Sequence, residues 1–268
     1  MGFIEHDKSG FIYLTASNID TPHAFTTRYG GVSEGIFSSM NLSLSGKDSR
    51  EYVEENYRIM CDALNMPMEN IIRTKQVHKT NVRAVTADDC VGLFDCYVED
   101  SDGLLTDVPG IPLIAFTADC IPILLYDPVR RVIGAVHAGW RGTTAGIAEI
   151  ALLKMASVYG SDPKDVRCAI GPGIGSCCFE TDRDVPEAIL NILGREGEQY
   201  FRPEGAKYYA DIKGVNKALL IRAGALEKNI EVSDECSMCL NEKYWSHRYT
   251  KGRRGNQACV IMLRGTEN

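Results

Sequence analysis

Short apolar runs that are bounded by turn residues recur along this chain and predict β-strands. Two of them cover residues 121–126 and 132–136, with Asp127 and Pro128 between them. Runs of this length with turn signals at their ends are typical of buried strands. Antiparallel pairing of the two would return the chain to its starting end. Cys120, just before the first run, would then lie close to His137, just after the second.

Other apolar runs predict further strands, and the first of them leads directly into His78. These runs cover residues 71–77, 102–106, 111–116, 166–170, 230–232 and 259–263. Two segments instead predict loops, because they are rich in Gly with Ser or Pro: residues 26–41 and residues 171–178, which read G-P-G-I-G-S-C-C.

Apolar residues spaced three or four apart predict amphipathic helices between these strands. They occur over residues 51–64, 185–193 and 211–226. A further helix is expected to follow Gly142 and to run to Tyr159, with Thr143 and Thr144 as its cap and Gly160 just past its end. Strands and helices alternate without a strict βαβ repeat. We therefore predict an α+β fold, a layered helix/sheet sandwich formed as one domain over residues 1–268.

Composition and charge narrow the class of protein. The chain has 268 residues, of which 44% are hydrophobic and 24% are charged, as in ordinary globular proteins. A formal charge of −7 argues against a general nucleic-acid binder. No apolar run approaches the roughly 20 residues that span a bilayer, and residues 1–9 do not resemble a secretory signal. We expect a cytoplasmic protein without a nucleic-acid or membrane partner.

The cysteines are ten in number and scattered, and without an export signal reduced thiols are the default. Most are expected to be small buried groups, among them Cys61, Cys168 and Cys259. Cys236 and Cys239 form a C-x-x-C, which alone is a weak signal for a metal or redox site. The vicinal Cys177 and Cys178 lack the spacing of a second zinc-ribbon pair, so an incidental or structural role is favoured for the C-x-x-C.

Three side chains stand out as candidate chemistry: His78, Cys120 and His137, each at the edge of an apolar run. Two histidines and one cysteine without a fourth ligand fit a catalytic zinc site with an open position. A thiolate favours Zn²⁺ or Cu(I). Alternatively, Cys120 and His137 form a nucleophile–base pair, or all three are ordinary buried or hydrogen-bonded residues. The residues alone leave these three interpretations open.

Several sequence blocks in fixed order resemble a known family. K-Q-V-H, D-G-L-L-T-D, A-D-C-I-P-I-L-L and V-H-A-G-W-R-G are similar to signature blocks of the YfiH-like proteins, also called the laccase-domain or polyphenol oxidase family. F-T-T-R-Y-G-G-V-S with M-N-L-S, A-I-G-P-G-I-G-S-C-C-F-E, W-S-H-R-Y and R-R-G-N-Q-A also match, so the resemblance covers nearly the whole chain. One departure is Lys79, where the family usually has Gly after the first ligand histidine.

The resemblance implies a metal held by His78, Cys120 and His137, with zinc as the first candidate and copper as the second. It also implies phosphorolysis of adenosine, inosine or methylthioadenosine, and deamination of adenosine. In deamination, zinc would lower the pKa of a bound water towards ~7. The expected partners are a purine nucleoside and phosphate, and a homodimer is one option for the assembly.

Phosphate needs cationic groups, and arginine suits it because its planar fork binds two oxygens at once. Arg28, Arg58, Arg141 and Arg248 are candidates. Arg58 is preferred, together with Asn41, by position within family-like blocks. If Arg58 holds phosphate, Arg58→Ala should abolish phosphorolysis more than deamination.

Two neighbouring residues have open roles beside this set. Asp119 either orients a ligand histidine or serves a turn. Trp140 either stacks on a purine or packs.

Three competing functions use the same residues. A multicopper oxidase needs a histidine-rich cluster that five histidines without an H-x-H pair cannot supply, although oxidation of phenols at a single copper ion stays open. A thiol hydrolase would use Cys120 as nucleophile and His137 as base. A binding factor with structural zinc would need a fourth ligand, such as Asp119 or Cys178. Chelation separates a metalloenzyme from the thiol hydrolase, because a metalloenzyme loses activity with its metal whereas a Cys–His dyad survives.

Overall fold

Two six-stranded sheets lie face to face at the centre of the computed structural model, which describes residues 2–90, 92–94 and 100–265. The first sheet has the order β1 (Phe3–Lys8), β2 (Phe11–Ala16), β3 (His23–Thr26), β15 (Gln257–Ile261), β7 (Leu113–Thr117) and β4 (Ile72–Arg73). The second has the order β14 (Ile230–Val232), β10 (Arg167–Ile170), β8 (Ile121–Asp127), β9 (Val132–Ala138), β6 (Gly103–Thr106) and β5 (Val82–Ala84).

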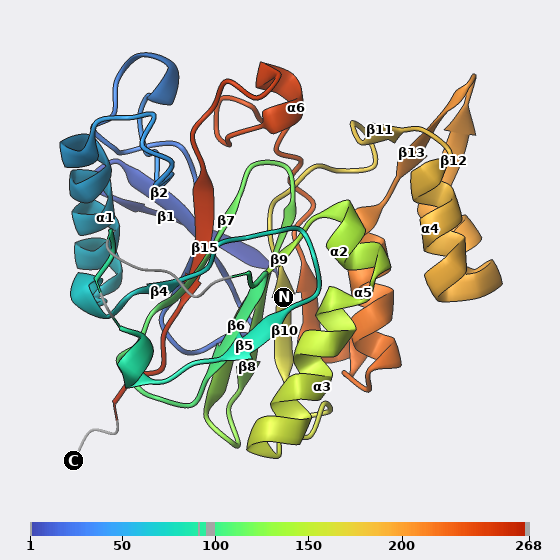
Figure 1. Ribbon diagram of the computed structural model, residues 1–268, viewed down its shortest axis with the longest axis horizontal. Helices are drawn as coiled ribbons and strands as arrows, with labels where there is room; N and C mark the ends of the chain where they lie inside the picture. Colours follow the sequence, from blue (N-terminus) through green and yellow to red (C-terminus); the bar gives the residue numbers. More distant parts are fainter. Residues whose placement is uncertain (1, 91, 95–99, 266–268) are drawn as a thin grey trace.

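Helices cover the outer face of each sheet, as Figure 1 shows. On the first sheet lies α1 (Arg50–Leu64); on the second lie α2 (Trp140–Thr144), α3 (Ile147–Tyr159) and α5 (Ile212–Arg222). At the periphery, α4 (Asp184–Leu193) stands beside a small sheet of β11 (Glu180–Thr181), β13 (Lys207–Ala210) and β12 (Phe201–Glu204). The short α6 is His247–Thr250. This order of layers confirms the predicted α+β helix/sheet sandwich.

Both faces of the central strands are buried, which explains their continuous apolar runs. Along β8, Leu124 packs between the two sheets, whereas Ile123 and Leu125 pack towards the helices. On the first sheet, Ile114 of β7 faces α1 while Leu113 faces the second sheet. No helix in the described part of the chain is long and apolar enough to cross a membrane.

The predicted hairpin of β8 and β9 is confirmed. Its register pairs Ile121 with Ala138 and Pro122 with His137. Cys120 and His137 therefore lie at the same end of this antiparallel pair. The strand predicted over residues 230–232 is present with those bounds, and the strands predicted around residues 102–106, 111–116, 166–170 and 259–263 are present with shifted ends.

The strand predicted over residues 71–77 is wrong beyond Arg73. β4 covers Ile72–Arg73, and from Lys75 onward the chain is irregular. The Gln76 side chain bonds both the N–H and the C=O of Phe116 in β7, at 2.7 and 2.8 Å, and so occupies the hydrogen-bonding groups that another strand would use. The sequence predicted no strand at β1, β2, β3 or β5, or in the small sheet of β11, β12 and β13.

The helix predicted after Gly142 begins earlier and is broken in two. α2 starts at Trp140 with Gly139 as its N-cap, and α3 starts after Gly146, whose φ of 90° is left-handed. Thr143 and Thr144 are therefore helical rather than capping residues. Gly160, with φ of 71°, ends α3 as predicted. The other three helices lie where they were expected, although α5 stops at Arg222.

Candidate metal centre and its cavity

His78, Cys120 and His137 come together at the upper end of the second sheet. One donor atom of each lies within 4.8 Å of the other two. The two imidazole rings are 4.7 Å apart and nearly perpendicular. His137 is the penultimate residue of β9 and is 2% exposed, Cys120 precedes β8 and is partly buried, and His78 is exposed. The three side chains thus form an open half-shell of one thiolate and two imidazoles.

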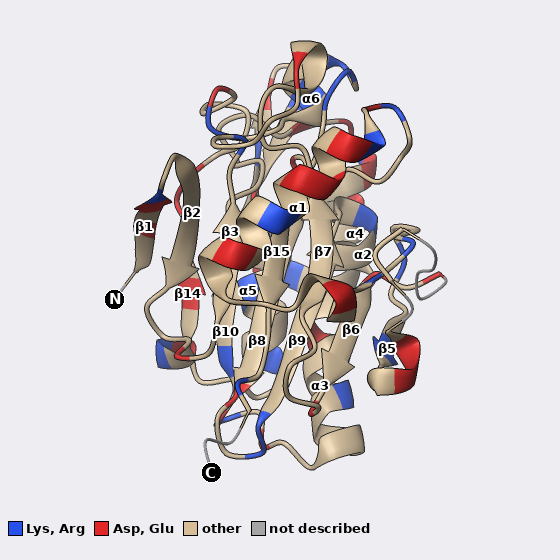
Figure 2. Cartoon of the chain, turned by 90° about the vertical axis from the view of Figure 1, so that its left-hand side faces the viewer, with Lys and Arg blue, Asp and Glu red and all other residues tan. Residues whose placement is uncertain are grey.

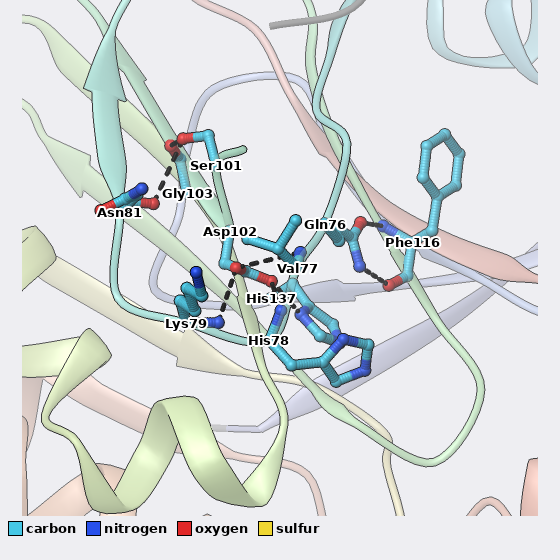
Figure 3. Close-up of polar contacts among 10 residues, drawn as sticks. All are labelled: Gln76, Val77, His78, Lys79, Asn81, Ser101, Asp102, Gly103, Phe116 and His137. Carbon is cyan, nitrogen blue, oxygen red and sulfur yellow. Dashed lines mark hydrogen bonds and ion pairs between the residues drawn. The ribbon is translucent and has the colours of Figure 1, made fainter. Parts of the chain in front are cut away.

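Asp102, a buried carboxylate just before β6, organises this half-shell (Figure 3). Its Oδ1 accepts from the His137 Nδ1 and from the backbone N–H of His78, both at 2.9 Å. Its Oδ2 accepts from the N–H groups of Val77 and Lys79, at 3.2 and 2.8 Å. One carboxylate therefore fixes the ring of one candidate ligand and the backbone of the other, including the left-handed φ of 58° at His78.

Space at the centre depends on Gly139, which joins β9 to α2. A Cβ atom there would lie 3.1 Å from the His78 ring, 3.3 Å from the Cys120 Sγ and 3.6 Å from the His137 ring. The first two separations are tighter than ordinary van der Waals contact. The three donor side chains can converge because this position has no side chain.

The electrostatics favour an ionised thiol. Burial alone would raise the pKa of Cys120, but the positive charge and hydrogen bonds of His137 and His78 lower it to about 6. Burial alone would lower the pKa of His137, yet the Cys120 thiolate and the Asp102 carboxylate raise it to about 9. A thiolate beside imidazole is the state that binds a soft metal or acts as a nucleophile.

A cavity of about 380 Å³ opens in front of the three side chains. Its size is in the range of small-molecule sites. Apolar and aromatic side chains form one part of the wall and cationic ones another. Besides the candidate ligands His78 and Cys120, the wall contains Ala118, Asp119, Ile121, Ala138, Trp140, Arg141, Ile174, Phe179, Ile212, His247, Arg248 and Arg254.

Three arginines reach the cavity, and the sequence analysis had selected two of them. Arg141 lies 4.3 Å from the Trp140 ring, and Arg248 donates to the Glu180 carbonyl at 2.8 Å. The third, Arg254, was missed, although it lies in the R-R-G-N-Q-A block. Its Nε–H is buried, and no atom of the described residues accepts from it. A buried donor without an acceptor is the environment into which an anion fits.

The structure does not bring Arg58 or Arg28 to the cavity. Arg58 lies on the exposed face of α1, where it pairs with Glu55 and approaches Glu54. Figure 2 shows that this face of α1 carries charges of both signs. Arg28 donates to the carbonyls of Ser38 and Asn241 and stacks over Trp245.

Asn41 is fully buried behind the cavity instead of lining it. Its Oδ1 accepts from the N–H of Asn256 at 3.0 Å, and its Nδ2 donates to Asp48 at 2.8 Å. Asn256 also binds the guanidinium of Arg254. Asn41 therefore holds the loop that carries the cavity arginine Arg254.

Asp119 has the turn role that was one of its two predicted alternatives. Its carboxylate accepts from the Ser237 hydroxyl at 2.7 Å and from the backbone N–H of Arg248 at 2.6 Å, and its φ is 88°. Trp140 lines the cavity, in a position to contact a planar ligand. Lys79 contributes its backbone N–H to Asp102, and its side chain does not line the cavity.

Cys177 and Cys178 lie beside the C-x-x-C, although their spacing in the sequence had indicated that they do not form a second pair with it. The structure places Cys177, Cys178, Cys236 and Cys239 together, with their Sγ atoms within 4.8 Å of one another. The burial expected for Cys61, Cys168 and Cys259 is confirmed.

A family model described as multi-copper polyphenol oxidoreductase laccase matches residues 22–264. The chain belongs to this family. The family predicted from the sequence blocks is thereby confirmed.

Several curated relatives of this chain are named purine nucleoside phosphorylase. One from Deinococcus radiodurans is 37% identical over 254 residues, covering 95% of this chain and 94% of the relative. Another from Geobacillus stearothermophilus, YlmD, is 35% identical over 243 residues, covering 89% of each chain.

Solved structures of the family share this fold. YlmD from Geobacillus stearothermophilus superposes with a TM-score of 0.92 at 32% identity, over 98% of this chain and 100% of that one. The hypothetical protein YfiH from Bacillus licheniformis superposes with a TM-score of 0.91 at 34% identity, over 97% and 99%.

Proposed function

We propose that this chain is a zinc-dependent purine nucleoside phosphorylase whose active site is the cavity at His78, Cys120 and His137. The observation that carries the proposal is the convergence of a three-ligand donor set and three arginines on one cavity. The curated relatives named purine nucleoside phosphorylase support the reaction class.

The residues fit a zinc ion by their chemistry. One thiolate and two imidazoles are zinc donors, and their donor atoms lie close enough for a single ion. Asp102 bonds the Nδ1 of His137 and so leaves Nε2 as the donor atom, an arrangement common in zinc sites. Zinc bound there would supply a Lewis acid with one open coordination position. Copper is the alternative ion, because thiolate and imidazole also suit Cu(I).

In phosphorolysis, a phosphate oxygen forms a bond to C1′ of the ribose while the bond from C1′ to N9 breaks, and the departing purine takes up a proton. We assign the phosphate to the arginine side of the cavity, with Arg254 as its main contact and Asn41 as the positioning residue behind it. The purine would lie against Trp140 and Phe179 on the aromatic side.

The finer assignments belong to the same proposal. They are adenosine, inosine and methylthioadenosine as substrates, with deamination of adenosine at C6 as a second reaction. Both reactions need the purine in the same cavity. Only phosphorolysis needs an anion beside the ribose.

Arg254→Gln tests the assignment of phosphate. We expect the KM for phosphate to rise roughly ten- to hundredfold, because a charge-assisted hydrogen bond contributes about 1.5–3 kcal/mol. The measurement is chromatographic detection of adenine released from adenosine at varied phosphate concentration. Arg254→Lys keeps the charge and should retain part of the affinity.

Arg58→Gln is the matched control, because it removes an exposed arginine that does not line the cavity. We expect it to leave the KM for phosphate unchanged. A large rise in Arg58→Gln together with none in Arg254→Gln would return the phosphate role to Arg58.

A thiol hydrolase is the second candidate, favoured by one observation. Cys120, His137 and Asp102 form a chain of thiol, imidazole and carboxylate, with the pKa of Cys120 lowered to about 6 and that of His137 raised to about 9. In that function Cys120 would attack an acyl or related carbon, and His78 would have no required part. Activity that survives a chelator but not an alkylating agent would select this candidate.

Oxidation of phenols at a single copper ion is a third candidate function with less support from the structure. The other three histidines lie outside the donor set of the described residues: His6 and His23 line a different hollow, and His247 lies on the cavity wall. The described residues therefore bring no further histidine to this donor set, as a multicopper cluster would require. Copper-dependent turnover of a phenol would support the single-ion version.

A further inference from the structure

We propose that Cys177, Cys178, Cys236 and Cys239 bind a second zinc ion, which holds one loop of the cavity wall to the segment of residues 236–240. The four Sγ atoms all lie within 4.8 Å of one another. Two of the separations, from Cys239 to Cys177 and to Cys178, are 3.5 and 3.4 Å. Zinc with four thiolates at about 2.3 Å places its sulfurs ~3.8 Å apart, so this cluster has the dimensions of a single ion.

Two turns of the backbone present the four thiols. Cys236 and Cys239 lie three residues apart on a helical turn closed by the bond from Leu240 N–H to the Cys236 carbonyl, at 3.0 Å. Cys177 and Cys178 lie on a turn in which Phe179 N–H donates to the Gly175 carbonyl at 2.9 Å. A bridge between Gly173 and Cys236 joins the two segments. The fold thus brings the four thiols together, although their spacing in the sequence is not that of a zinc ribbon.

Backbone N–H groups donate hydrogen bonds to the sulfur of Cys236, as they commonly do to a thiolate that binds a metal. Gly175 N–H donates to it at 3.2 Å, and the amides of Met238 and Cys239 also donate to it. A Cβ atom on Gly175 would lie 3.2 Å from the Cys177 Sγ and 3.3 Å from Cys236, so this position must be small. N–H donors of this kind stabilise the ionised thiolate that a metal requires.

A buried cation lies next to the cluster. Lys213 is 6% exposed, and its ammonium donates to the carbonyls of Ser233 and Glu235 at 2.8 and 2.7 Å. Among the described residues no carboxylate forms an ion pair with it, and the negative groups that act on it from a distance are Cys236, Asp211, Asp234 and Cys177. Buried lysines are rarely found unpaired. Zinc with four thiolates carries a net charge of −2, which this ammonium would partly balance.

The proposed ion would be structural, because four protein ligands leave no open position. It would join the glycine loop of residues 171–179 to residues 236–240. The first loop contributes Ile174 and Phe179 to the cavity, and Ser237 of the second bonds Asp119 beside Cys120. Binding would release the protons that the four thiols carry.

The test is the zinc content of the full chain purified under reducing conditions, measured by plasma mass spectrometry. We expect Cys236→Ser with Cys239→Ser to lose one equivalent of zinc per chain relative to the native protein. Cys90→Ser, a partly buried cysteine outside both clusters, is the control and should lose none. The one-equivalent difference holds whether or not the His78 site carries metal, so this test is independent of the proposed function.

Differential alkylation of the native protein covers the case in which the double variant does not fold. The exposed thiols of Cys177 and Cys239 should resist N-ethylmaleimide in the zinc-loaded protein and react after a chelator is added, as mapped by peptide mass spectrometry. Equal zinc in native and double-variant protein, rapid alkylation of the zinc-loaded protein, disulfides among these four cysteines, or iron with sulfide in place of zinc would each overturn the proposal.

Discussion

Asp102 contributes two different interactions to the candidate metal centre. It accepts a hydrogen bond from the His137 ring and three from the backbone amides of residues 77–79. An aspartate is required for both, because a neutral amide has one acceptor oxygen in place of two and would direct N–H groups at N–H groups. Asp102 is therefore a positioning residue for both histidines.

Asp102→Asn should lower the zinc affinity of the His78 site roughly ten- to hundredfold, the range typical of outer partners of metal ligands. Competition with a chromophoric chelator measures this affinity directly. Asp107→Asn, an exposed aspartate that follows β6, is the matched control and should leave the affinity unchanged. Unchanged affinity in Asp102→Asn would remove the positioning role.

At the residue scale, the sequence indicated the candidate ligands but not what surrounds them. His78, Cys120 and His137 could be selected because few histidines exist and each of the three lies at the edge of an apolar run. Asp102 and Arg254 could not, because their roles arise from contacts between segments distant in sequence. The D-G-L-L-T-D and R-R-G-N-Q-A blocks were signals for both, but aspartates and arginines are common on surfaces.

At the scale of elements, the β8–β9 pair and the start of α2 determine where the donors meet. The register sets His137 opposite Pro122, two residues from Cys120. Gly139 then turns the chain into α2 immediately beside all three side chains. The centre depends on this junction because a Cβ atom would lie within 3.4 Å of two of the donors.

Gly139→Ala should weaken zinc binding roughly tenfold, because the His78 ring or the Cys120 sulfur must move by a few tenths of an ångström. The same chelator competition reports the change. Gly110→Ala is a contrasting variant: its Cβ would contact nothing within 4 Å, and its φ of 75° strains the backbone instead. We expect Gly110→Ala to lower the unfolding temperature but not the zinc affinity. The opposite pattern would contradict the role of Gly139.

Three strands, β7, β8 and β9, were predictable because they are buried and their sequences are apolar runs. β2 and β3 are also buried but were missed. The segment that carries His78 was wrongly predicted to be a strand, because its apolar residues and Gln76 fit a strand pattern. In the structure, the Gln76 side chain bonds the backbone of Phe116 and the backbone N–H of His78 donates to the Asp102 carboxylate. The edge strand β1 was missed because its residues are largely exposed and polar.

At the scale of the whole molecule, the stability of the sandwich should depend on pH through His23. This residue begins β3, is 4% exposed, accepts from the Ala16 N–H at 2.9 Å and donates to the Thr21 carbonyl at 2.8 Å. Burial lowers its pKa from 6.5 to about 4. Its neutral form is therefore the one that the fold accepts.

The unfolded chain binds a proton at this histidine below pH 6.5 and the folded chain does not, so stability must fall as the pH falls. As the pH falls from 7 to 5, this difference lowers the free energy of unfolding by about 2 kcal/mol. Urea unfolding of native protein and of His23→Gln measures it, since glutamine can both accept and donate there. We expect the variant to lose this part of the pH dependence and His6→Gln to keep it. Parallel curves for native protein and His23→Gln would refute this origin.

We propose that metal-dependent phosphorolysis of purine nucleosides takes place in the cavity at His78, Cys120 and His137. Adenine release from adenosine tests this, with protein that has been stripped with a chelator and then titrated with zinc, with and without phosphate. We predict no adenine from stripped protein, recovery in proportion to added zinc when phosphate is present, and no recovery in His78→Ala. Full activity of metal-free protein, or adenine release that does not depend on phosphate, would contradict the claim.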